Sequence, residues 1–110
     1  MTRIKNSVYY RNIQKMADKT VGFDWDKGNL EKSWLKHGVR QNESEAVFVD
    51  RESIVSEDPK HSQIEKRWLL LGKTKQGKYL AVVFTKRQNK IRVISARPMN
   101  QKERRLYEKK

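Results

Sequence analysis

The chain has 110 residues and no cysteine, which excludes disulfide bridges and zinc sites built on thiolates. It carries 26 Lys and Arg against 13 Asp and Glu, a net charge of +13, and its length suits one domain with a thin core. No stretch is apolar enough to cross a bilayer, and no apolar run follows the basic N-terminus as in a secretory signal, so a cytoplasmic protein is expected.

The positive charge is concentrated toward the ends of the chain. Residues 86–110 hold ten Lys and Arg and two Glu, whereas residues 21–85 are nearly neutral. Concentrated positive charge attracts polyanions and raises their rate of association. A solubilising surface or an acidic protein partner would account for the same charge.

The chain begins with a segment of weak helical periodicity. Residues 1–20 are predicted to form an N-terminal extension, helical or partly disordered, and residues 21–110 to form the domain proper. The domain opens with a short strand over residues 21–25, where apolar and polar side chains alternate.

Two helices are expected after this strand. Asp26 is suited to cap the first one, and Gly38 supplies the left-handed residue that ends it. The apolar stripe of this helix consists of Leu30, Trp34 and Leu35. A second, shorter helix is predicted over residues 44–49, with Asn42 as its cap.

The hydrophobic period then changes to two, which predicts a series of strands. The expected strands are residues 53–55, 67–71, 79–86 and 91–97. Asn100 and Glu103 have the spacing of a capping box that opens a C-terminal helix. This order predicts an α+β fold, with N-terminal helices packed on one face of an antiparallel sheet of about four strands and a C-terminal helix; the helices are expected to share one face.

Three arginines fall on the predicted strands: Arg67, Arg92 and Arg97. An arginine on a half-buried strand is costly unless something pairs with it, and the guanidinium group suits phosphate oxygens. The three are therefore predicted to form a phosphate clamp. The alternative is that each pairs with a nearby acid such as Glu65 or Glu103.

Strict alternation along the last strand divides its side chains between two faces. Ile91, Val93 and Ser95 would point one way, and Arg92, Ile94 and Ala96 the other.

His61 and Glu65 lie close to Arg67 at the start of a strand, and either can serve as a general base. RNA carries its own nucleophile, the 2′-hydroxyl. A metal-free nuclease therefore needs only a base, cations for the phosphorane and an acid for the leaving oxygen. Tyr107 or a lysine can fill the last role, and Tyr107, on a polar helix, can also stack a base.

Further basic residues near the C-terminus are expected to bind the RNA backbone: Lys86, Lys90, Arg104 and Arg105. No Gly-rich phosphate loop follows a strand, and no paired carboxylates have a clear metal arrangement. Neither a cofactor nor a metal is expected.

Four motifs in fixed order resemble those of the BrnT family. They are FDWDKGNLEKSWLKHGV (residues 23–39), SEAVF (44–48), HSQIEKRW (61–68) and IRVISARPMNQKERRLYE (91–108). The last is the most specific, and together the motifs span nearly everything from Phe23 onward.

The resemblance implies a RelE-like fold and a ribonuclease toxin that arrests translation. It also implies a BrnA-like antitoxin, often with a ribbon-helix-helix part, through which operator DNA would be bound indirectly. By motif match the activity candidates would be Arg67, Arg92, Arg97 and Tyr107, with Glu65 and His61 in support. Two alternatives remain open: a non-catalytic RNA- or DNA-binding protein, and a module whose basic face only docks an antitoxin.

Overall fold

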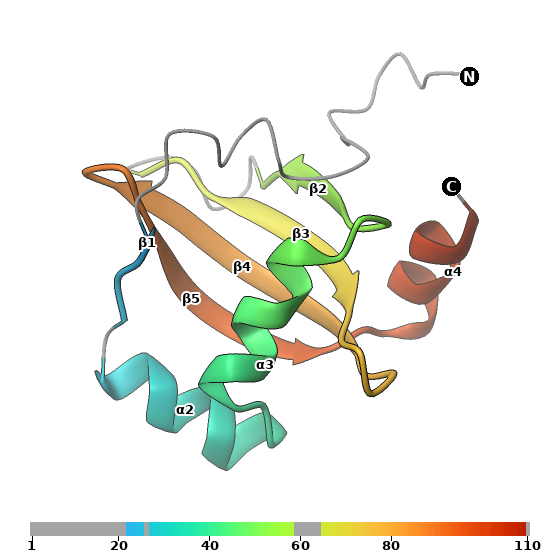
Figure 1. The fold of residues 1–110 in the computed structure, drawn as a ribbon, viewed down its shortest axis with the longest axis horizontal. Helices are drawn as coiled ribbons and strands as arrows, with labels where there is room; N and C mark the ends of the chain where they lie inside the picture. The colour runs from blue at the N-terminus through green and yellow to red at the C-terminus, as the bar shows by residue number, and fades with distance from the viewer. Residues whose placement is uncertain (1–21, 26, 59–64, 110) are drawn as a thin grey trace.

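A five-stranded mixed sheet lies at the centre of the computed structural model, which describes residues 22–25, 27–58 and 65–109 (Figure 1). Its strands in spatial order are β1 (Gly22–Phe23), β5 (Lys90–Pro98), β4 (Tyr79–Arg87), β3 (Trp68–Lys73) and β2 (Ile54–Glu57). The helix predicted within residues 1–20 and the cap predicted at Asp26 lie outside the described residues.

The prediction of about four antiparallel strands is wrong in one respect. β2 to β5 are antiparallel neighbours, but β1 adds a fifth strand that runs parallel to β5. The register pairs Gly22 with Lys90 and Phe23 with Ile91. A parallel partner needs a long crossover, and here most of the domain separates the two strands in sequence.

The described residues form three α-helices beside the sheet: α2 (Lys27–His37), α3 (Gln41–Ala46) and α4 (Gln101–Lys109). A 3₁₀ turn, η1 (Val47–Val49), continues α3. Figure 1 shows α3 crossing the front of the sheet. None of the helices in the described ranges is long and apolar enough to span a membrane.

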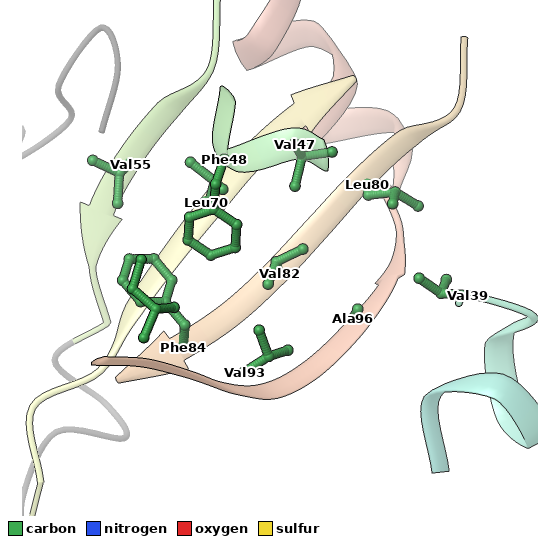
Figure 2. Packing of buried hydrophobic residues seen from close by; sticks show 11 residues of the cluster. Val39, Val47, Phe48, Val55, Leu70, Leu80, Val82, Phe84, Val93 and Ala96 are labelled. Atoms are coloured by element: carbon green, nitrogen blue, oxygen red, sulfur yellow. The ribbon is translucent and has the colours of Figure 1, made fainter. Parts of the chain in front are cut away.

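The main core, which we call the α3 core because η1 continues α3, lies between η1 and one face of the sheet. Val47 and Phe48 from the helical segment meet Leu70, Val82 and Phe84 from the central strands (Figure 2). The ring of Phe48 packs edge-on against Phe84, with ring centres 5.1 Å apart. Burial of these side chains supplies the main stabilisation of the sheet.

A second, smaller core, which we call the α4 core, lies on the opposite face, under α4. Tyr107 and Leu106 of α4 pack here against Ile54, Leu71 and Ala81 of the sheet. The prediction that the helices share one face is therefore wrong, because neighbouring residues such as Leu70 and Leu71 belong to different cores. Each central strand is apolar on both faces and needs cover on both.

α2 ends as predicted but buries a different side. Gly38 has a φ of 67°, and its amide donates to the carbonyl of Trp34. Trp34 and Leu35, expected in the buried stripe, are 48% and 79% exposed. α2 lies against β5, and among the side chains of this helix that the structure describes, Ser33 is buried.

α3 begins earlier than predicted, at Gln41 rather than Ser44, and Asn42 lies within its first turn. The amide of Arg40, the residue before the helix, donates to the carboxylate of Glu43 at 2.9 Å.

The capping box predicted at the start of α4 is confirmed. Asn100 Oδ1 accepts from the amide of Glu103 at 2.8 Å, and Glu103 Oε1 accepts from the amide of Asn100 at 2.9 Å.

β5 contains a bulge where it pairs with β4. Val83 pairs with Ser95 and Phe84 with Val93, so Ile94 is the extra residue. Val93 and Ala96 consequently point into the same core, while Ser95 points to the opposite face. The strict alternation predicted for this strand is wrong for Ser95 and Ala96.

Gly72 allows η1 to sit close against β3. A Cβ atom added at Gly72 would lie 2.8 Å from Val47 Cβ and 3.0 Å from the Val47 carbonyl oxygen. Gly72→Ala is expected to lower the free energy of unfolding by about 1–3 kcal/mol, because the η1 backbone must move. Urea unfolding followed by circular dichroism measures this change.

Lys75→Ala, in the exposed turn after β3, is the control and should change stability by less than about 0.5 kcal/mol. Equal unfolding midpoints for Gly72→Ala and the control would contradict the tight contact.

Candidate nucleic-acid interface

The three predicted arginines lie on the sheet face opposite α3. Arg92 and Arg97 are neighbours in sequence of Val93 and Ala96, which point into the α3 core, so the arginines point away from it. Arg67 likewise precedes Trp68, which packs on that core. We call the part of this sheet face that carries Arg67, Arg92 and Arg97 the arginine face.

A depression of about 410 Å³ lies on the arginine face. It is lined by Ser56, Glu57, Asp58, Arg67, Leu69, Val83, Ile94, Ser95 and Arg97. Its lining combines the apolar side chains of Leu69, Val83 and Ile94 with hydroxyl, carboxylate and guanidinium groups. This volume is within the range of small-ligand sites, so the depression can accept part of a nucleotide.

Arg97, at one side of the depression, is held by α4. Its two terminal nitrogens donate to the two carboxylate oxygens of Glu103, each at 2.7 Å. Burial opposes ionisation of Glu103, but hydrogen bonds from Arg97 and the Asn100 amide outweigh it and lower the pKa of the Glu103 carboxyl. The pairing considered as an alternative for Arg97 is thus observed, and it ties β5 to α4.

Glu65 lies among several arginines at the other end of the face. Its carboxylate accepts from Arg87 Nε at 2.7 Å and from Arg87 Nη2 at 3.1 Å. These hydrogen bonds, with the nearby charges of Arg67 and Arg92, lower the pKa of Glu65. The Glu65 carboxylate is therefore ionised at neutral pH, and it lies near Arg67 and Arg92, two of the three candidate phosphate-binding arginines.

The chain segment after β1 reaches Arg92. The Asp24 amide donates to the carbonyl of Ile91 at 2.8 Å, which extends the parallel pairing. Asp24 Oδ2 then lies 3.4 Å from Arg92 Nη1, whose side chain is 17% exposed. Arg92 is thus oriented from one side and keeps contact with solvent.

Tyr107, which was predicted to stack a base or to act as an acid from a polar helix, is buried. Its side chain is 4% exposed, its ring packs edge-on against Tyr79, and its hydroxyl donates to Asp50 Oδ2 at 2.7 Å. Burial and the Asp50 carboxylate raise the pKa of the Tyr107 hydroxyl. The prediction that it stacks a base is wrong in its premise, because the ring is inside the α4 core.

The remaining predicted residues are dispersed. Lys90 lies across the β4–β5 hairpin from Arg87. Arg87 was not predicted as a site residue, although the two-residue turn at Gln88-Asn89 places it opposite Lys90. Lys86 pairs in register with Ile91 of the α3 core, so it lies on the α3 side of the sheet and not on the arginine face.

The two predicted arginines of α4 do not line the depression. Arg104 stacks on the Tyr79 ring at 3.8 Å and approaches Glu108, and Arg105 lies on the outer side of α4. His61 lies outside the described residues. In the described ranges, no three His, Asp or Glu side chains gather so that they could hold a metal ion.

Comparisons with known proteins agree on one family. The family described as the ribonuclease toxin BrnT of type II toxin–antitoxin systems matches residues 25–103. The crystal structure of the Brucella abortus ribonuclease toxin BrnT shares 21% identity, with a TM-score of 0.54 over 74% of this chain and 100% of that one, which shows a common fold. A search of curated proteins found no match.

The position of Tyr107 leads to a prediction that separates a structural from a catalytic role. Tyr107→Phe is expected to lower the free energy of unfolding by about 1–2 kcal/mol, because a partly buried hydrogen bond to a carboxylate is lost. Chemical unfolding of the purified protein measures this. RNA cleavage by the folded variant should match that of the wild type.

Tyr79→Phe is a matched control, because the Tyr79 hydroxyl makes only a longer, exposed contact of 3.3 Å with Glu108. It should change stability by less than about 0.5 kcal/mol. Loss of cleavage in Tyr107→Phe at unchanged stability would restore the catalytic assignment.

Proposed function

The chain belongs to the BrnT family of ribonuclease toxins of type II toxin–antitoxin systems, and from this we propose that it is a metal-independent endoribonuclease of the cytoplasm that cleaves RNA and arrests translation. The supporting observation is that Arg67 and Arg92 lie on one sheet face around the ionised Glu65. The toxin domain would be residues 21–110, and a RelE-like fold and an N-terminal extension over residues 1–20 remain predictions.

In the proposed reaction the 2′-hydroxyl of RNA attacks the adjacent phosphorus. The O–P bond to the 5′-oxygen of the next nucleotide breaks, which leaves a 2′,3′-cyclic phosphate and a 5′-hydroxyl. Arg67 and Arg92 would bind the phosphate oxygens and stabilise the extra negative charge of the phosphorane. Arg97 would contribute to the same clamp from the far side of the depression, and its pair with Glu103 would fix its orientation.

Two proton transfers complete the scheme. Glu65 or His61 would take the proton of the 2′-hydroxyl, and a lysine such as Lys90 would supply the proton of the leaving oxygen. Glu65 is ionised at neutral pH and can accept a proton, although its lowered pKa makes it a weak base while Arg87 holds it. Tyr107 has no part in this scheme, because it is buried and its hydroxyl is held by Asp50.

The proposed protein partner is a BrnA-like antitoxin, often with a ribbon-helix-helix part, so that operator DNA would be bound through the antitoxin. Membership of a type II toxin–antitoxin family implies a protein that neutralises the toxin.

The metal-independent mechanism predicts cleavage without divalent ions. Purified protein should cut RNA in EDTA as fast as in Mg²⁺, and the products should end in 2′,3′-cyclic phosphate, because the nucleophile belongs to the substrate. Gel analysis and mass spectrometry of the fragments measure both. Intact RNA under these conditions, with and without ribosomes, would rule the enzyme out; steeply salt-dependent binding without cleavage would favour the non-catalytic alternative.

The clamp predicts the effect of removing each arginine. Arg67→Gln and Arg92→Gln should each lower the cleavage rate about 10²–10³-fold, because each removes charge stabilisation from the transition state. Arg51→Gln, an exposed arginine in the turn after η1, makes the same charge change and should keep near wild-type cleavage. Circular dichroism checks the fold, and full activity in both clamp variants would contradict the assignment.

A further inference from the structure

α2 presents a large apolar surface that the rest of the described chain does not cover. Trp34 is 48% exposed and Leu35, its neighbour, is 79% exposed. Arg40 lies beside them, with its guanidinium carbon 4.8 Å from the centre of a Trp34 ring. We call Trp34, Leu35 and Arg40 the α2 patch. Apolar side chains of this size grouped at one place on a surface indicate an interaction site.

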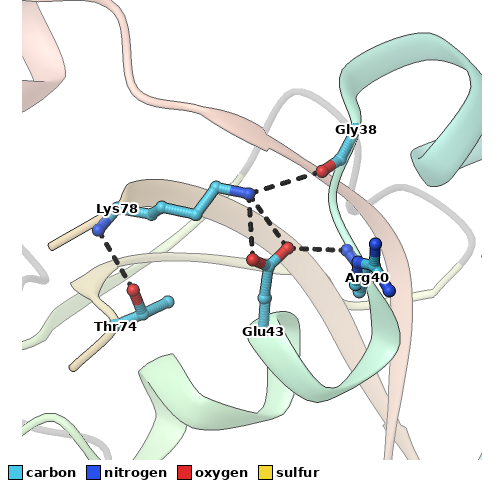
Figure 3. Close-up of polar contacts among 5 residues, drawn as sticks. All are labelled: Gly38, Arg40, Glu43, Thr74 and Lys78. Atoms are coloured by element: carbon cyan, nitrogen blue, oxygen red, sulfur yellow. Dashed lines mark hydrogen bonds and ion pairs between the residues drawn. The ribbon is translucent and has the colours of Figure 1, made fainter. Parts of the chain in front are cut away.

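The patch is held in a fixed shape by the turn that follows α2. Lys78 Nζ donates to the Gly38 carbonyl at 3.4 Å and to both Glu43 carboxylate oxygens at 2.9 and 3.0 Å (Figure 3). Glu43 in turn accepts from the Arg40 amide. These contacts fix the backbone between α2 and α3, so Arg40 meets Trp34 without any partner present. A preorganised surface loses less entropy on binding.

The surroundings of the patch define the chemistry of its partner. A shallow depression of about 320 Å³ adjoins Trp34 and is lined also by Glu31, Val39, Arg40 and Gln41. The exposed Lys32 and Lys36 belong to the same helix. With Arg40, they outnumber Glu31, the acid in the described part of α2, and the charge of the nearby Glu43 is balanced by Lys78. This balance favours a partner that carries negative charge next to apolar side chains.

We infer that the α2 patch is the docking surface for the antitoxin, which binds it through an acidic segment with apolar side chains. This inference rests on the proposed function for the existence of that partner. An exposed leucine cannot stack on a base, whereas tryptophan and arginine are enriched at the centre of protein interfaces. The patch therefore fits a protein better than RNA.

The location has a consequence for inhibition. The α2 patch is on the helix that packs against β5, whereas the arginine face is the sheet face opposite α3. Substitutions in the patch should therefore separate antitoxin binding from RNA cleavage. A toxin altered only in this patch would stay active in the presence of the antitoxin.

The experiment uses the full-length protein and the purified BrnA-like antitoxin that is proposed as its partner. Leu35→Glu should weaken binding at least about 30-fold, because a carboxylate would face an acidic partner in an apolar contact. Trp34→Ala should weaken binding to a similar extent. Isothermal titration calorimetry gives the dissociation constants, and RNA cleavage by each free variant should equal that of the wild type.

Val49→Glu is the matched control, because Val49 is 77% exposed on η1 and lies outside the patch. It should bind and be neutralised as the wild type is. Lys32→Glu with Lys36→Glu tests the charge, and should weaken binding more at low salt than at high salt.

Three outcomes would overturn the inference. If Leu35→Glu binds the antitoxin as tightly as Val49→Glu does, the α2 patch is not the docking surface. Loss of RNA cleavage with antitoxin binding intact would make the patch an RNA surface. An unchanged affinity of the double lysine variant would exclude an acidic segment. Binding is measured without RNA, so a failure of the ribonuclease proposal alone leaves these outcomes readable.

Discussion

The bulge at Ile94 is the constraint on which the arginine face depends. Arg92 and Arg97 are five positions apart, so strict alternation along a strand would point them to opposite faces. Ile94, the extra β5 residue between Val93 and Ser95, shifts the alternation by one, because the β4 partners of these two residues, Phe84 and Val83, are adjacent. It leaves Val93 and Ala96 together in the α3 core and brings both arginines to the other face. Without the bulge, one arginine would have to enter the main core at a large cost in desolvation.

α4 sets the boundary of that face, and its position depends on a few polar contacts. Glu103 caps the helix through Asn100 and also binds Arg97, so one carboxylate joins the helix start to β5. At the other end of α4, Asp50 accepts from the Tyr107 hydroxyl and from the Lys73 amide. These contacts hold α4 over Ile54, Leu71 and Ala81 on the second sheet face, and the depression lies on the same face. The same pairing that orients Arg97 also reduces its availability to a phosphate, which makes Arg67 and Arg92 the stronger members of the clamp.

Local signals in the sequence predicted the features that depend on neighbouring residues. The Asn100 and Glu103 box and the Gly38 helix end follow from backbone groups within one turn, and both are present as expected. The arginines of β5 were located on a strand because the apolar residues around them alternate. By contrast, the parallel pairing of β1 joins residues far apart in the chain, and no local pattern encodes it.

Three errors have a common physical origin, which is that burial depends on what lies across from a residue. Trp34 and Leu35 have helical spacing, but α2 packs against β5 with the side of Ser33, and both residues stay exposed. Tyr107 has polar neighbours in sequence, yet its helix face meets Leu71 and Ala81 of the sheet. The bulge at Ile94 is set by the pairing with β4. Reading each segment alone gives its period but not the partner that determines its buried side.

The pair of Glu65 and Arg87 connects the electrostatics of the arginine face to the proposed chemistry. Arg87 is the first cause of the lowered pKa of Glu65, ahead of the more distant charges of Arg67 and Arg92. A phosphate that took the two Arg87 donors would release Glu65 from its strongest hydrogen bonds. The pKa of Glu65 would then rise toward its ordinary value, and its carboxylate would become a better base at the moment substrate is bound. In the absence of RNA the same pair would keep Glu65 ionised without making it strongly basic, so substrate binding and base strength would increase together.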